Sequence, residues 1–414
     1  MNPPRIRRDW LGSLSLTLLL CLAPFGAQAA EDAETIAALK AQLAELTARL
    51  DALESKDKIR VETYQAPVNV PAPTSKPSWT DRIKWKGDFR YRHETIDAEF
   101  ADNTRHRNRI RARPAMAIDL SESLEVGFGL GTGGEDPTSA NQTLGGGFAS
   151  KQINVDLAYF KWDTDWDGFS ILGGKYKNPL HRAGGNGLLW DSDIRPEGML
   201  ANFERAGFRV SALFNWLSES SAAGEDALAF GGQLDWSTNI GENSKLLIGA
   251  GYYDFSSVEG KEVPFDDNPR GNSVDALNRY LYGYQDVELF GEFSFNMGKY
   301  PTTLFLNYVE NLDAPEFDQG FAIGGTVNFM HGDRPWKLGY VYQDLEADAV
   351  FALFTDSNFG GGGTDATGHI LRGTYNLTSQ ISFGGTLFIN KRGENQTGIE
   401  EDYNRFMLDV QFKY

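Results

Sequence analysis

Arginines occupy every second position in one stretch of the chain, from residue 105 to residue 113. Successive side chains of a β-strand point to opposite faces, so this spacing places the row on one face of a strand. Like charges stacked across strands destabilise a sheet unless water or carboxylates neutralise them. The pattern therefore predicts the wall of a water-filled lumen in which guanidinium groups meet anions. The narrower alternative is a dedicated ladder for phosphate or sugar phosphate. Including the hairpin partner of this segment, the candidate pore-lining residues are Arg90, Arg92, Arg107, Arg109, Arg111 and Arg113.

A second charged group lies in the segment 177–197, where Asp191, Asp193 and Glu197 fall close together and Pro196 stiffens the chain. If this segment folds into a barrel, it narrows the pore, and its carboxylates can face the arginine row. Permeation through such a site depends on its diameter and on the fixed charges around it. We therefore predict a constriction loop over 177–197, with these three carboxylates as pore-lining residues.

Other patterns that could carry chemistry are weak. The glycines at 129–134 match a nucleotide-binding spacing, but no helix follows to hold a pyrophosphate. Asp191 and Asp193 could bind Ca²⁺, but further ligands at regular spacing are lacking. The five histidines are scattered and none pairs at metal-ligand spacing. No Ser/His/Asp grouping supports the enzyme alternative, an outer-membrane lipase or protease. We therefore expect no catalytic residues, no cofactor and no metal.

The elements that would position these groups repeat with a period of two. Between Leu124 and Leu130, for example, apolar residues alternate with Glu125 and glycines. Most such segments match the roughly 9–11 residues that a tilted strand needs to cross a bilayer. We count sixteen, at 84–96, 105–119, 124–132, 151–163, 169–176, 198–204, 208–217, 228–238, 245–256, 286–297, 302–311, 320–330, 336–347, 367–378, 381–391 and 403–414.

The connections between these segments alternate between short and long, as they do in outer-membrane barrels. A soluble sandwich, the alternative, would need its apolar faces to meet, but the opposite faces are too polar and glycine-rich to form a second packed layer. In a closed barrel the apolar face contacts lipid and the polar face contacts water, and no strand edge is left unpaired. The predicted fold is all-β: a closed antiparallel transmembrane β-barrel of about 16 strands over 81–414, with a short α-helical coiled coil before it.

The N-terminal region predicts three shorter parts. Residues 1–30 have the arginines, apolar stretch and small-residue cleavage site of a signal peptide, with an anchor helix as the alternative. Residues 31–60 predict a coiled-coil helix, with an amphipathic helix packed on its own chain as the alternative. Residues 61–80 form a proline-rich linker. The coiled-coil seam comprises Ile36, Leu39, Leu43, Leu46, Leu50 and Leu53.

Composition narrows the function classes. The 414 residues include 39 Lys and Arg against 57 Asp and Glu, and a net charge of -18 argues against nucleic acid as a partner. A mean hydropathy of -0.40 and the lack of a long apolar run after residue 25 exclude a helical membrane protein. The only cysteine, Cys21, would leave with the signal peptide, so the mature chain would have no disulfide.

Two stretches resemble the putative porin family of Gram-negative outer-membrane proteins, which share their architecture with sixteen-stranded general porins. They run from Gly173 to Pro179 and from Leu188 to Gly198, where a strand of that family enters its constriction loop. The C-terminal aromatic residues resemble the insertion signal of outer-membrane β proteins; they are Phe406, Phe412 and Tyr414. The resemblance implies a passive diffusion channel, a homotrimer and the outer-membrane insertion machinery as a partner. It implies no particular solute.

Together these observations predict a porin in the cell outer membrane, in contact with its lipid and with the coiled coil in the periplasm. It would pass small hydrophilic solutes down their gradients, with an anion preference set by the arginine-lined lumen. The alternative is a structural tether whose coiled coil links the barrel to the periplasm or the cell wall.

Overall fold

A computed structural model describes residues 41–42, 44–49, 51–52, 79–219, 226–331 and 334–414. The chain divides into two units, Met1–Ser75 and Lys76–Tyr414. In the first unit the described residues are helical, and Leu46 among them is 63% exposed. The other predicted seam positions lie outside the described residues, as do the predicted signal peptide and residues 61–78 of the linker; the seam positions are Ile36, Leu39, Leu43, Leu50 and Leu53.

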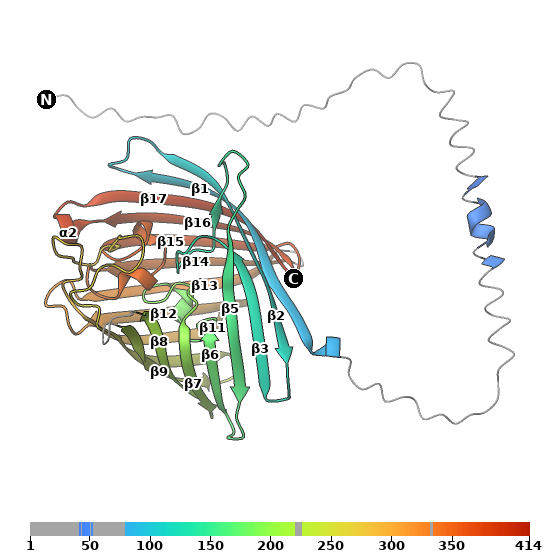
Figure 1. Cartoon of the computed structure of the whole chain (residues 1–414), viewed down its shortest axis with the longest axis horizontal. Helices are drawn as coiled ribbons and strands as arrows, with labels where there is room; N and C mark the ends of the chain where they lie inside the picture. The colour runs from blue at the N-terminus through green and yellow to red at the C-terminus, as the bar shows by residue number, and fades with distance from the viewer. Residues whose placement is uncertain (1–40, 43, 50, 53–78, 220–225, 332–333) are drawn as a thin grey trace, which may run out of the picture. The chain divides into compact units, whose positions relative to one another are not determined.

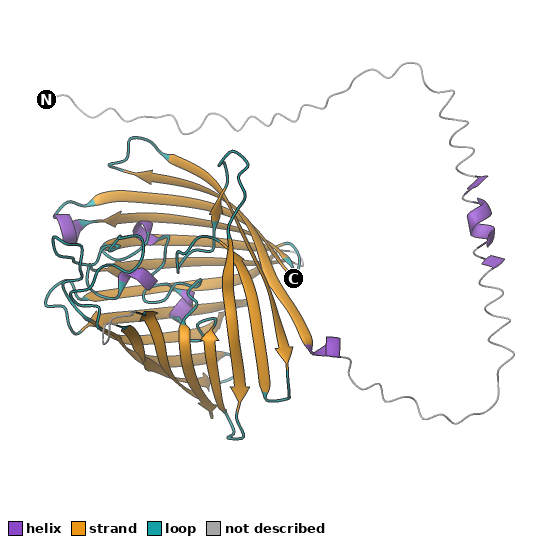
Figure 2. Ribbon diagram, in the orientation of Figure 1, coloured by secondary structure: helices purple, strands orange, loops and turns teal. Residues whose placement is uncertain are grey.

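In the described part of the second unit, sixteen long antiparallel strands form one sheet that closes on itself, because the first strand pairs with the last (Figures 1 and 2). The predicted closed barrel is therefore confirmed. The strands are β1 (Ile83–Ala98), β2 (Arg105–Asp119), β3 (Leu124–Thr132), β5 (Ile153–Asp163), β6 (Phe169–Lys175), β7 (Glu197–Arg205), β8 (Phe208–Ser218), β9 (Ala227–Ile240), β10 (Ser244–Ser256), β11 (Tyr284–Met297), β12 (Tyr300–Asn311), β13 (Gln319–His331), β14 (Arg334–Leu345), β15 (Ala366–Asn376), β16 (Ile381–Arg392) and β17 (Glu401–Lys413).

Short elements accompany these strands. A 3₁₀ turn, η1 (Trp79–Arg82), precedes β1, and a two-residue strand, β4 (Gln142–Thr143), pairs with β2. The sequence pattern did not predict β4, because two residues cannot show a period. The loops carry η2 (Ala183–Gly185), η3 (Ala352–Phe354), η4 (Phe359–Gly361) and α2 (Glu394–Thr397).

The alternation of side chains along each strand gives the barrel an apolar outside and a largely polar inside. On β8, Phe208, Val210 and Phe214 are exposed on the outer face, whereas Ser211 and Asn215 are buried inside. This is the pattern of a strand that faces lipid on one side and a lumen on the other. None of the described helices is long and apolar enough to span a bilayer.

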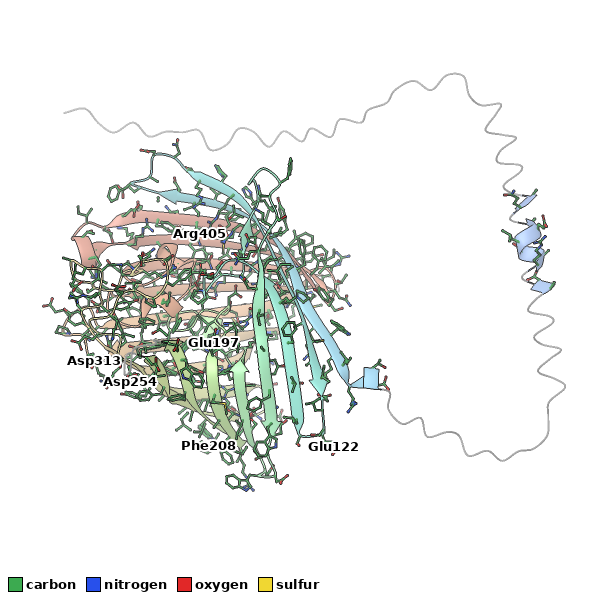
Figure 3. All side chains as sticks on the ribbon, in the orientation of Figure 1. Glu122, Glu197, Phe208, Asp254, Asp313 and Arg405 are labelled. Carbon is green, nitrogen blue, oxygen red and sulfur yellow. The ribbon has the colours of Figure 1, made fainter. Side chains whose placement is uncertain are left out.

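The two ends of the barrel differ in the length of their connections, as predicted. Glu122 marks the end with short turns, and Asp254 and Asp313 mark the end with long loops (Figure 3). Both ends of the barrel domain, the start of β1 and the end of β17, lie at the short-turn end, because Asp88 pairs with Lys413 near them. The long connections 176–196, 257–283 and 346–365 fold back into the barrel (Figure 1).

These three connections build an apolar core inside the barrel, against the inner faces of β9–β13. Trp190 lies at its centre, with its ring 5.3 Å from that of Tyr253, 5.9 Å from Phe255 and 5.8 Å from Phe354. Aromatic pairs at such separations add to the stabilisation from area burial alone. Packing against the loops therefore closes this side of the lumen.

The turn η2 shows how tightly a loop is seated on the wall. Gly184 has a φ of 61°, a left-handed conformation that favours glycine, and a Cβ there would lie 2.2 Å from the Phe305 ring. Its backbone N–H donates to the Glu292 carboxylate on β11 at 2.6 Å. A glycine is therefore required where the loop backbone meets β11 and β12.

Polar contacts hold the other two long loops together. The Asn272 side chain, 1% exposed, donates to the Ala347 and Val350 carbonyl oxygens at 2.8 and 3.0 Å and accepts from the Ala352 N–H at 2.9 Å. Without the loop 346–365, the buried amide of Asn272 would have no hydrogen-bond partner, so the loops 257–283 and 346–365 must dock together.

We expect Trp190→Ala to loosen the constriction loop. Removing a buried tryptophan costs about 3–5 kcal/mol, and here the loss falls on the contacts between the loop and β10. Single-channel recordings in a planar bilayer should show larger conductance fluctuations, and the folded barrel should denature at a lower temperature on gels. Trp166→Ala is the control, because Trp166 lies in a short turn and is 74% exposed. Currents from Trp190→Ala as quiet as those of the control would contradict this role.

Candidate functional site: a charged constriction

The register of the first hairpin places the predicted arginines on one inner surface, which we call the arginine wall: the inward-facing residues of β1 and β2. Arg90 lies opposite Arg111, and Arg92 opposite Arg109. The same face also carries two carboxylates, Asp88 opposite Arg113 and Glu94 opposite Arg107. Our sequence prediction of the site did not include Asp88 and Glu94, although the period of two places both on the arginine face.

Glu94 is the centre of one cluster of ion pairs. Its side chain is fully buried, and it accepts from Arg107 Nε at 2.5 Å and from Arg109 Nη1 at 3.5 Å. Arg92 Nη1 lies 3.6 Å from Glu94. The Nε and Nη2 groups of Arg92 donate to the two carboxylate oxygens of Asp409 on β17, at 2.6 and 2.8 Å. A bidentate pair is strong and fixes the orientation of the guanidinium group. These carboxylates therefore hold the arginine side chains in place along the wall.

Asp193 of the constriction loop pairs with the arginine wall. It accepts from Arg111 Nη1 at 3.2 and 3.3 Å and from Arg113 Nη1 at 2.8 Å. Both arginines also pair with Asp88. Burial alone would raise the pKa of Asp193, but the guanidinium groups of Arg111 and Arg113 outweigh it and hold the pKa below its ordinary value. Asp193 is therefore ionised and ties the loop to the wall.

Asp191 has a different role from its neighbour. Its carboxylate accepts from the backbone N–H of Asp193 at 2.7 Å and from that of Ser357 at 3.1 Å, so it joins the constriction loop to the loop 346–365. Burial, followed by the nearby charges of Asp356 and Asp193, raises the pKa of Asp191 to about 7. This group therefore titrates in the neutral range.

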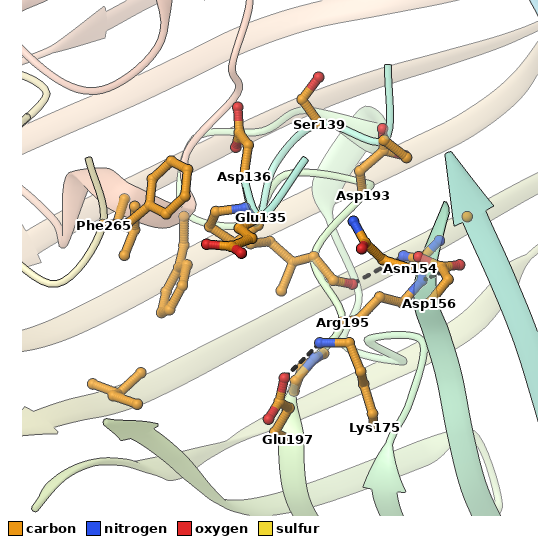
Figure 4. A pocket seen from close by; sticks show the side chains of 18 of the residues that line it. Glu135, Asp136, Ser139, Asn154, Asp156, Lys175, Asp193, Arg195, Glu197 and Phe265 are labelled. Atoms are coloured by element: carbon orange, nitrogen blue, oxygen red, sulfur yellow. Dashed lines mark hydrogen bonds and ion pairs between the residues drawn. The ribbon is translucent and has the colours of Figure 1, made fainter. Parts of the chain in front are cut away.

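Glu197, the third predicted carboxylate, lies apart from the arginine wall. It is the first residue of β7 and lies opposite Lys175 in register, and the two side chains pair at 2.6 Å (Figure 4). Nearby, Arg195 pairs with Asp156 at 3.2 Å. These groups line a cavity of about 430 Å³ above the short strands β6 and β7.

Three polar cavities are lined by charged side chains of the barrel and its loops. The cavity of about 360 Å³ nearest the long loops is lined by Arg105, Arg107, Arg109, Arg270 and Arg405. The cavity beside the constriction loop has a volume of about 210 Å³, the smallest of the three, and we call it the constriction cavity. It is lined by polar neutral groups and by Arg90, Arg92, Arg111, Arg182, Arg372, Asp191, Asp193 and Asp356. The cavity of about 340 Å³ at the short-turn end is lined by His181, Arg209, Asp235, Lys245 and Glu292 among others.

Several of these groups could not be found from local spacing. Arg182, Arg372 and Arg405 each come from a different part of the chain, and Figure 3 labels Arg405 within the barrel. In the described residues, no group of three or more His, Cys, Asp or Glu side chains could hold a metal ion.

The C-terminal aromatic residues lie on the outer face. Phe406 and Phe412 of β17 are exposed there, as is Tyr414 at the chain end, and the Phe412 ring lies 6.0 Å from that of Phe89. Their position agrees with an apolar, lipid-facing band. Their proposed use as an insertion signal stays a prediction.

The closed antiparallel barrel, its outward apolar face and its charged interior define an outer-membrane channel of the porin class. The chain belongs to the family described as Putative porin, whose model matches residues 97–278 and 286–413. The sequence resemblance to that family is thereby confirmed.

One solved structure supports the same fold. Pseudomonas putida OprB has a TM-score of 0.55 at 10% identity, covering 80% of this chain and 94% of OprB. A triple mutant of Rhodopseudomonas blastica porin has a TM-score of 0.46 at 12% identity, covering 80% of this chain and all of that one. No curated protein sequence matches this chain significantly.

We expect ion selectivity to change with pH through Asp191. Below its pKa of about 7 the group is neutral, and above it the constriction cavity gains one negative charge. The anion-to-cation permeability ratio should therefore fall as the pH rises from 6 to 8, measured from the zero-current potential in a KCl gradient. Because the pKa of Asp191 is higher in the folded state, its protonation adds to the free energy of unfolding at low pH. This contribution is complete below the unfolded-state pKa of about 3.9 and is lost as the pH rises through 7.

The matched variants are Asp191→Asn, which cannot ionise, and Glu204→Gln at the short-turn end. The pH response should disappear in the first and persist in the second. If Asp191→Asn showed the same change of zero-current potential with pH as the wild type, another group would be responsible for the titration.

Proposed function

We propose that this outer-membrane channel passes small hydrophilic solutes passively and prefers anions. The observation that supports this most strongly is the constriction cavity, where five arginines face three aspartates among the described lining residues. One of those aspartates, Asp191, is partly protonated near neutral pH. Fixed charges at the narrowest part of a pore act on ions at short range and in a poorly screened setting, so they set selectivity.

The proposal explains why a strongly acidic chain can favour anions. The net charge of -18 is spread over the whole sequence, whereas the arginine wall lies along the path. The cavity toward the long loops adds Arg105, Arg270 and Arg405 to the wall residues. Anions entering from that end would meet guanidinium groups before they reach the constriction.

Assembly and location follow from the family and the surface. We propose a homotrimer in the outer membrane, inserted with the help of the C-terminal aromatics, with the N-terminal coiled coil in the periplasm. The exposed apolar outer face supports contact with lipid. No feature of the described residues favours the structural tether over the channel.

Purified protein in a planar bilayer should give stepwise currents in KCl. The double variant Arg109→Gln/Arg111→Gln removes two positive charges from the wall and should lower the anion-to-cation permeability ratio several-fold, because both residues line the interior cavities. Arg334→Gln is the control; Arg334 bonds the Tyr375 hydroxyl at the short-turn end, away from these cavities. A silent wild-type barrel would contradict the channel, whereas an unchanged permeability ratio in the double variant would contradict the role of the wall.

A further inference from the structure

Three arginines at the constriction cavity differ from the rest in how they are paired. In the described part of the chain, Arg90 has no carboxylate partner; its Nη2 donates to Asn141 Oδ1 at 2.6 Å, and its buried Nε has no hydrogen-bond partner. Arg182 donates only to the backbone carbonyl oxygens of Asn186 and Trp190, at 3.4 and 3.2 Å. Arg372 has one loose contact, 3.6 Å from Asp356.

The other two arginines of this cavity are already committed. Arg92 makes its bidentate pair with Asp409, and Arg111 is shared between Asp88 and Asp193. A buried donor without a partner costs about 1–3 kcal/mol, and more when it is charged. The buried Nε of Arg90 is such a donor. Arg182 has only backbone carbonyl partners and Arg372 only a loose contact with Asp356, so both have N–H groups that an incoming acceptor could use.

The surroundings of these three donors favour an acceptor with several oxygens. The constriction cavity is also lined by neutral polar groups that can donate: the hydroxyls of Ser192 and Thr386, and the amide of Asn358. Its three carboxylates are occupied, because Asp193 pairs with Arg111 and Arg113, Asp191 accepts two backbone N–H groups, and Asp356 accepts from Asn358. Arginine forks match carboxylate and phosphate oxygens in a bidentate manner.

We propose that Arg90, Arg182 and Arg372 form an oxyanion-binding subsite, which holds the phosphoryl or carboxylate group of a solute during its passage. The proposal rests on the channel function and adds to it a class of solute. A general field of positive charge would favour all anions equally, whereas this subsite favours anions whose oxygens can bond more than one arginine. Binding must also be weak enough for the solute to leave the subsite. The constriction cavity is not fully enclosed, which allows this release.

The experiment measures block of chloride current by inorganic phosphate, added to one side of a bilayer containing the full-length protein. Wild-type current should fall as phosphate is raised. The half-blocking concentration should rise about tenfold in Arg90→Gln, Arg182→Gln and Arg372→Gln. Arg209→Gln is the matched control, because Arg209 also faces the lumen but pairs with Asp235 at 2.7 Å near the short-turn end. An equal half-blocking concentration in all four variants would overturn the subsite.

A second variant separates the subsite from simple loss of charge. Arg90→Lys keeps the positive charge but loses the planar fork, so phosphate block should weaken several-fold while the zero-current potential in KCl shifts less than it does in Arg90→Gln. Block by phosphate as strong as in the wild type would overturn the proposal. Stepwise KCl currents in each variant show that it folds and conducts; if no protein conducted, the channel function itself would fail.

A parallel series with succinate distinguishes the two sources of the oxyanion. Block by phosphate alone, sensitive to the three arginines, assigns phosphoryl solutes to the subsite. Block by succinate alone, with the same sensitivity, assigns carboxylate solutes. Block by neither anion overturns the proposal.

Discussion

Guanidinium groups packed side by side inside a barrel repel one another unless carboxylates neutralise their charge. The positions of those carboxylates explain much of this structure. Arg92 and Arg111 are each only 5% exposed, so these arginines must pair with a carboxylate or keep a donor without a partner. The wall contains its own partners, Asp88 and Glu94, at intervals along β1. Further partners arrive from β17, as Asp409, and from the constriction loop, as Asp193. The position of the loop is therefore part of the charge balance of the wall.

Two different forces act on the constriction loop within four residues of sequence. Trp190 packs into the apolar core on the side of β10, and Asp193 pairs with Arg111 and Arg113 on the opposite wall. Asp191, between them, fastens the loop 346–365. Apolar packing thus fills one side of the lumen, and ion pairs define the other. The constriction cavity, of about 210 Å³, lies beside these ion pairs and is lined by Asp191, Asp193 and Arg111 among others.

The sequence predicts this architecture well where the signal is local. Each strand of β1–β3 and β8–β17 shows its own alternation, and even the short strands β6 and β7 were found within a residue or two. The arginine row was visible because a period of two places it on one face. Glu197 shows the limit: it was assigned to the loop, but β7 begins at this residue, and its side chain points to the face opposite that of Leu200.

Groups that meet through tertiary contacts could not be predicted. Asp409 pairs with an arginine 317 positions away, and Arg182 and Arg372 reach the constriction cavity from unrelated segments. The internal core was missed for a related reason. Its apolar residues in the loops 257–283 and 346–365 follow no regular period, so only the folded barrel shows that they pack together.

The most direct test of this account is the accessibility of two single cysteines, in a chain that also carries Cys21→Ser and so has no other thiol. Ser192 is exposed in the constriction cavity, whereas Ala322 faces inward from β13 and is fully covered. A negatively charged methanethiosulfonate reagent should reduce the current through Ser192→Cys and leave that through Ala322→Cys unchanged. Block at Ala322→Cys without block at Ser192→Cys would contradict a conduction path along the arginine wall.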